Sequence, residues 1–90
     1  MKKVVITVVG KDQVGIIAKV CTYLADNSIN IQDISQTIVD GYFNMMMISD
    51  ISGCHKDFVL IQNELKELGE SIGVIIRIQD EAVFDMMHRI

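Results

Sequence analysis

Residues 29–51 read INIQDISQTIVDGYFNMMMISDI. The stretch contains two runs of apolar and β-branched residues, which are typical of strands, separated by the dipeptide Asp40-Gly41. Asp-Gly tolerates positive φ at both central positions of a two-residue turn. The stretch therefore predicts an antiparallel hairpin that pairs residues 29–39 with residues 42–51.

An irregularity is expected inside the first of these strands. Ile29 and Ile31 face one side of a regular strand, whereas Ile34 and Ile38 fall on the other. A bulge near Gln32-Asp33 would return all of them to one face, and bulges are favoured on edge strands. The first strand of the hairpin is thus expected at the edge of its sheet.

A strand and a helix are predicted before the hairpin. Residues 3–9, KVVITVV, are apolar on both faces, as expected of a strand in the middle of a sheet. The helix follows Gly15 and ends near residues 26–28. Its apolar residues recur with a period of 3.6: Ile16, Ile17, Val20, Cys21, Leu24 and Ala25.

A second helix and a fourth strand are predicted after the hairpin. Phe58, Ile61, Leu65 and Leu68 form a helical stripe, and this helix should stop near Gly69 or Gly73. The charged residues before and between them indicate a solvated face: Lys56, Asp57, Glu64, Lys66 and Glu67. Alternation over residues 72–79 predicts the strand. Asp80-Glu81 could then cap a short helix with an apolar face of Val83, Met86, Met87 and Ile90.

The order of elements predicts an α+β, ferredoxin-like βαββαβ sandwich plus a C-terminal helix. Right-handed crossovers place both long helices on one face of a four-stranded antiparallel sheet of order 4-1-3-2. We expect one domain over residues 1–90, with its core in 3–79 and an extension in 80–90. The strand at residues 42–51 has apolar residues on both sides. The C-terminal helix, a second subunit or both should therefore cover the open face of the sheet.

Composition excludes several classes of function. Ninety residues form a small core, yet half of them are apolar, which favours a surface that is covered by a partner. The net charge of −4 argues against nucleic acid. No apolar run is long enough to span a membrane, and the N-terminus lacks the cleavage site of a signal peptide.

The cysteines and histidines do not suggest a disulfide, a metal or a catalytic site. Cys21 lies in a helical stripe and Cys54 in a turn, so a reducing, cytoplasmic location is expected. Cys54-His55 has no third partner nearby for nucleophilic or metal chemistry. Met45-Met46-Met47 should mainly fill the core. The sequence thus predicts neither an enzyme nor a cofactor.

The residues of the loop after the first strand help to distinguish between the functions that proteins of this fold perform. It lacks the paired cysteines of a copper carrier and the arginine of an acylphosphatase, and the first strand lacks the aromatic residues of an RNA-recognition module. Gly10, Asp12 and Gly15 remain before the helix, and Asn30 enters the next strand. Backbone N–H groups there could hold a ligand carboxylate, and Asp12 a ligand amine. Alternatively, Asp12 caps the helix and Gly15 permits close packing.

These residues resemble the signature of the ACT domains, small regulatory modules of amino-acid biosynthetic enzymes. The similarity lies in residues 10–16, GKDQVGI, and residues 30–34, NIQDI, within a resemblance that spans residues 3–79. It extends in particular to small stand-alone bacterial and archaeal ACT proteins, to glycine-cleavage repressor-like proteins and to formyltetrahydrofolate deformylase. The extension at residues 80–90 fits the stand-alone group.

The resemblance implies a homodimer that binds an amino acid or similar small metabolite between its subunits. In serine-sensing ACT domains, the residues at the positions of Asp12 and Asn30 contact the ligand, the second from the neighbouring subunit. This sequence has Asp where Asn is more usual, and Gly10 where those sensors have His, so serine itself is not specified. The implied ligand-binding residues are Gly10, Lys11, Asp12, Gln13, Val14, Gly15, Asn30 and Ile31.

A second interpretation stays open. The ACT fold can serve only as a dimeric scaffold that docks on another regulatory protein or enzyme and has no ligand of its own. Under that interpretation Asp12→Ala leaves partner binding intact, whereas a charge at Val83 or Met86 disrupts it.

Overall fold

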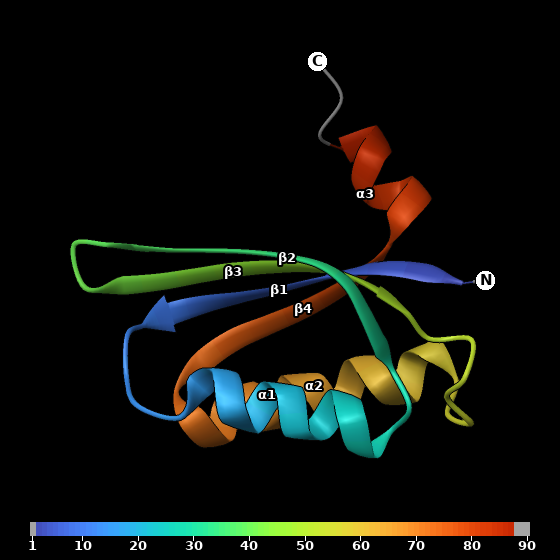
Figure 1. Cartoon of the computed structure of the whole chain (residues 1–90), viewed down its shortest axis with the longest axis horizontal. Coiled ribbons are helices and arrows are strands. Elements are labelled where there is room, and N and C mark those ends of the chain that lie inside the picture. The colour runs from blue at the N-terminus through green and yellow to red at the C-terminus, as the bar shows by residue number, and fades with distance from the viewer. Residues whose placement is uncertain (1, 88–90) are drawn as a thin grey trace.

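The computed structural model describes residues 2–87. A four-stranded antiparallel sheet has the order β2-β3-β1-β4, which is the predicted order read from the other edge (Figure 1). The elements along the chain are β1 (Lys3–Lys11), α1 (Ile16–Asp26), β2 (Asn30–Val39), β3 (Tyr42–Asp50), α2 (Phe58–Ile72), β4 (Val74–Asp80) and α3 (Glu81–Met87). The predicted fold class is confirmed.

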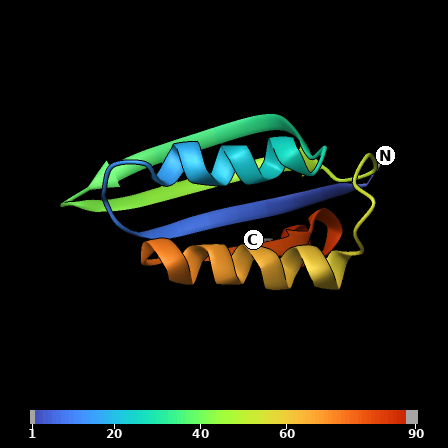
Figure 2. The same ribbon diagram turned by 90° about the horizontal axis from the view of Figure 1, so that it is seen from below.

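The core lies between the sheet and the two long helices. In Figure 2, which views the molecule from the helix side, α1 lies in front of the β2–β3 side of the sheet and α2 in front of the β4 side. The apolar stripes of both helices meet the inward residues of the central strands, which is the burial that stabilises a two-layer domain. Residues with at most 2% of their surface exposed include Val4, Ile6, Val8, Ile16, Val20, Leu24, Met45, Met47, Ile61 and Leu65.

The hairpin forms as predicted. Asp40 and Gly41 have φ of 53° and 80°, the left-handed values that a two-residue type I′ turn requires, and Val39 pairs with Tyr42 across it. The register shifts between Ile31 and Asp33, so the predicted bulge is confirmed. Beyond the bulge, β2 turns Ile34 and Ile38 to the helix side of the sheet.

The structure shows which of the two predicted glycines ends α2. The helix passes through Gly69 and ends at Gly73, whose φ of 80° lets it cap the helix in the left-handed conformation. Ile72 therefore belongs to the last turn of α2, and β4 begins two residues later than expected. Gly69 instead permits close contact with β4, because a Cβ there would lie 2.6 Å from the Val74 carbonyl oxygen.

The second face of the sheet is largely open. Two rows of side chains cross it from β4 to β2, namely Arg77, Thr7, Met46 and Ser35, then Ile75, Val9, Asn44 and Thr37. α3 projects from the end of β4 on this side (Figure 1) and leaves Val83, Met86 and Met87 exposed. The expected cover by the C-terminal helix is thus partial. Ile90, the last member of its predicted apolar face, lies outside the described residues.

Candidate functional site

The loop from Asp12 to Gly15 is held between two distant parts of the chain. The backbone N–H of Asp12 donates to the Gly41 carbonyl oxygen at 2.9 Å, which ties the loop to the hairpin turn. The Gln13 side-chain amide donates to the Ile72 carbonyl oxygen at the end of α2. Gln13 therefore positions the loop, and the loop's shape depends on the tertiary fold.

Helix α1 begins without a side-chain cap. Gly15 is its N-cap residue with φ of 92°, and nothing lies within 4 Å of the position that a Cβ would occupy. The first N–H groups of a helix have no partner within it, and here the described side chains supply none. The alternative role of Asp12 as the helix cap is wrong. This open helix start can accept an anionic group, because the helix dipole adds to its N–H donors.

The side chains around this helix start are exposed. Lys11, Asp12 and Gln13 lie at the surface, and Val14 is fully exposed, which is unusual for an apolar residue. Gly10 is different because it pairs with Phe43 on one side and Val74 on the other. A Cβ on Gly10 would lie 2.7 Å from a Val74 methyl carbon, so packing against β4 leaves no room for a larger residue.

Asn30 and Ile31 lie at the opposite end of the sheet from this loop. Asn30 pairs with Asp50, which also pairs with Lys3, whereas Lys11 pairs with Tyr42 next to the hairpin turn. The eight residue-to-residue steps from Lys3 to Lys11 span about 26 Å at the rise of an extended strand. One chain therefore brings together the predicted site residues 10–15 but not Asn30 and Ile31.

A polar cluster that the sequence did not reveal joins α1 to α2. Glu64 Oε1 accepts hydrogen bonds from Tyr23 Oη at 2.8 Å and from Lys56 Nζ at 2.7 Å. Burial and the bond to Glu64 raise the pKa of Tyr23, and the bonds from Lys56 and Tyr23 lower the pKa of Glu64. Lys56 and Glu64, which were predicted on a solvated face, are thus only partly exposed and are paired with each other. The bond between Tyr23 and Glu64 links α1 to α2.

The cysteines and His55 form neither a disulfide nor a metal-binding cluster within residues 2–87. Cys21 and Cys54 are free thiols that are partly buried, and His55 is exposed. Residues 2–87 contain no cluster of three or more side chains that could hold a metal ion. No helix within that range is long and apolar enough to cross a bilayer.

Comparison with known proteins yields a family and a set of close relatives. The model of the ACT domain family matches residues 4–70. A UPF0237 protein of Bifidobacterium longum is 59% identical over the full length of both chains. A UPF0237 protein of Methanocaldococcus jannaschii is 47% identical, again over the full length of both.

Solved structures agree on the fold. An ACT domain protein from Streptococcus pneumoniae superimposes with a TM-score of 0.82 at 44% identity, covering 93% of this chain and 94% of that one. A putative glycine cleavage system transcriptional repressor gives a TM-score of 0.73 at 25% identity, with 87% of this chain aligned to 44% of that chain. A formyltetrahydrofolate deformylase from Pseudomonas syringae shares the fold at 23% identity, with a TM-score of 0.83 over 99% of this chain and 36% of that chain.

Proposed function

Because this chain belongs to the ACT domain family, we propose that it is a non-enzymatic regulatory module that homodimerises and binds an amino acid or similar small metabolite between its subunits. The observation that carries the proposal is the uncapped start of α1, within a loop that the hairpin and α2 hold in place. The N–H groups of the first turn take the ligand carboxylate. Asp12 takes the ligand amine, since its carboxylate is exposed beside them.

A second subunit supplies the rest of the site. β2 is an edge strand of ten residues without Lys or Arg, nine of them exposed, so its outer backbone groups are available to another strand. Antiparallel pairing of two copies of β2 about a two-fold axis would place Asn30 of the partner subunit opposite Val39. Val39 adjoins the turn whose Gly41 holds Asp12. This pairing therefore brings Asn30 and Ile31 of one chain to residues 10–15 of the other.

Apolar side chains beside β2 give the dimer its stability. Ile34 and Ile38 on the strand are 46% and 58% exposed, and Ile17 on α1 is 38% exposed. Burying such area is worth roughly 25 cal/mol per Å², which offsets part of the entropy lost on association. The dimer is thus expected to be stable before any ligand binds.

Thermal unfolding with each of the twenty amino acids, on protein whose mass is measured by light scattering, tests the proposal. We expect a mass twice the 10.1 kDa of the chain and a higher Tm with one or a few amino acids. A ligand at 100 times its Kd adds about 2.7 kcal/mol to the free energy of unfolding. A folded dimer whose Tm no amino acid raises, or a monomer, would contradict it.

The second candidate function is a dimeric adaptor that docks on another regulator or enzyme and has no ligand of its own. Exposure of Val83, Met86 and Met87 favours it, because α3 projects on the open side of the sheet (Figure 1). Met86→Glu would then abolish partner binding without changing the oligomeric state, whereas Asp12→Ala would leave partner binding intact.

A further inference from the structure

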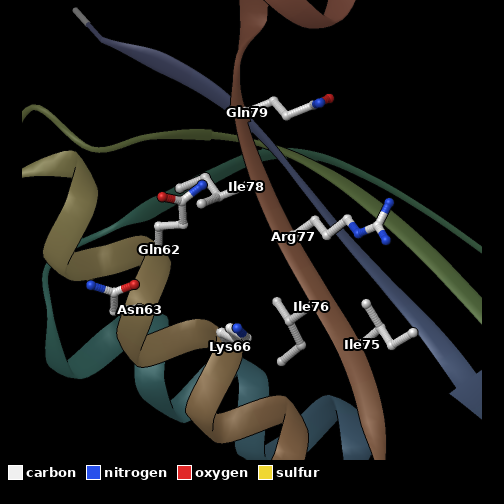
Figure 3. Close-up of a pocket in the computed structure, with 8 residues that line it drawn as sticks. All are labelled: Gln62, Asn63, Lys66, Ile75, Ile76, Arg77, Ile78 and Gln79. Carbon is white, nitrogen blue, oxygen red and sulfur yellow. The ribbon is translucent and has the colours of Figure 1, made fainter.

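We propose that the free edge of β4, with the groove beside it, binds an extended acidic segment of another protein as an added strand. The groove has a volume of about 500 Å³. Its lining comes from α2 and β4 (Figure 3), namely Gln62, Asn63 and Lys66 on the helix and residues 75–79 on the strand. This surface is separate from the metabolite site, which lies in the loop after β1.

The close approach at Gly69 gives the groove its wedge shape. Because Gly69 has no side chain, the last turns of α2 pack directly on the start of β4 at Val74. From there the helix and the strand diverge, so the space between them opens toward Gln62 and Ile78 (Figure 3). The groove is therefore built into the packing of α2 on the sheet.

The backbone of β4 offers hydrogen bonds along this groove. β4 pairs with β1 and lies at the edge of the sheet that residues 2–87 form. An edge strand presents unpaired N–H and C=O groups on its outer side, and an extended peptide can satisfy them by adding to the sheet. The occupant that suits this edge is thus a segment in the strand conformation.

The positive charge of the groove favours acidic residues in that segment. Lys66 and Arg77 line it, no carboxylate does, and neither cation belongs to an ion pair of the described residues. Arg77 points away from α2, toward the open face, whereas Lys66 lies on the helix side (Figure 3). Successive side chains of an added strand point to opposite faces, so acidic residues on either face would meet a cation. In a chain of net charge −4, this is a local site for an acidic partner.

Arg77 also argues against a second copy of this chain as the occupant. It is the central residue of Val74–Asp80, so antiparallel pairing of two β4 strands about their centres would place two Arg77 side chains directly opposite each other. Like charges in directly opposed positions destabilise a sheet. β2 contains no cation and lacks this barrier. The two edges are therefore suited to different partners.

Titration of ¹⁵N-labelled protein with a capped eight-residue peptide that alternates valine and glutamate, followed by NMR, tests the proposal. We expect chemical shift changes concentrated at residues 75–79 and at Gln62, Asn63 and Lys66. The double variant Lys66→Glu, Arg77→Glu should bind this peptide about tenfold more weakly, as expected for the loss of two ion pairs, and should instead prefer a peptide that alternates valine and lysine.

Lys19→Glu on the exposed surface of α1 is the matched control for the change of charge, and it should bind the glutamate peptide as the wild type does. Three results would overturn the proposal: no shift changes at millimolar peptide, shift changes confined to β2, or equal binding of both peptides by the wild type. These outcomes are independent of amino-acid binding, because the thermal unfolding assay detects the metabolite site without any peptide.

Discussion

Gly69 lies so close to Val74 that a Cβ atom on residue 69 would sit 2.6 Å from the Val74 carbonyl oxygen. The obstacle is backbone, which cannot rotate away as the end of a flexible side chain can. Because Gly69 is buried in the last turn of α2, this contact sets the separation between the end of the helix and β4.

Gly69→Ala should therefore destabilise the protein although alanine favours helices. The added methyl forces α2 away from the sheet, at a cost of about 1–3 kcal/mol that exceeds the gain of about 1 kcal/mol in helix propensity. Urea unfolding measures the difference. Glu67→Ala, at an exposed position of the same helix, should change the free energy of unfolding little. An unchanged or higher stability of Gly69→Ala would contradict the close contact.

Glu64 should make stability depend on pH. Its hydrogen bonds from Lys56 and Tyr23 lower its pKa below the ordinary value of 4.5, so its contribution is present above pH 4.5 and is lost as the pH falls through the folded-state pKa. Glu64→Gln should lower the Tm at pH 7, and the difference from the wild type should shrink below pH 4.5. Glu67→Gln is the control. A difference that does not vary with pH would refute this role of the carboxylate.

Ser49→Ala should stabilise the protein. Ser49 is fully buried on β3, and its hydroxyl oxygen has no hydrogen-bond partner among the described residues. An unsatisfied buried hydroxyl costs about 1–3 kcal/mol, so its removal should raise the free energy of unfolding by about 1 kcal/mol. Thermal and urea unfolding measure the effect, with the exposed Ser35→Ala as a neutral control. A loss of stability in Ser49→Ala would indicate that the hydroxyl is bonded.

Mixed dimers should reveal the two-chain metabolite site. Asp12→Ala and Asn30→Ala homodimers should each fail to bind the amino acid that raises the wild-type Tm. A heterodimer with one subunit of each kind retains one intact site and loses both contacts in the other. Calorimetry on heterodimers isolated with two affinity tags should therefore find half the wild-type number of sites at unchanged Kd. Absence of binding in the heterodimer would show that Asp12 and Asn30 do not share a ligand.

Local sequence signals were sufficient for the fold. Asp40-Gly41 predicted the turn because few dipeptides accept positive φ twice, and the switch in parity of the isoleucines predicted the bulge. The end of α2 stayed ambiguous because a glycine that caps a helix and one that allows close packing look alike in sequence. Only the tertiary contact with Val74 distinguishes Gly69 from Gly73.

The sequence predicted the candidate site less completely. The loop residues are contiguous, so their proximity follows from the chain itself. Gln13 and Ile72 are 59 residues apart, and no sequence pattern predicts the hydrogen bond between them that fixes the loop. The same holds for Tyr23 and Glu64, which are 41 residues apart. Such contacts depend on how the two helices pack on the sheet, which periodicity does not specify.

Asp12 and Asn30 lie at opposite ends of the sheet, which makes binding of the metabolite depend on the concentration of the protein itself. If each pocket needs parts of two chains, dilution below the dissociation constant of the pair dismantles the pocket before the polypeptide unfolds. The concentration of metabolite needed for half occupancy then rises as copies of the protein become scarce. In a cell with few copies of the protein, the same metabolite concentration would fill fewer sites. Site occupancy would therefore depend on the abundance of the protein as well as on the metabolite.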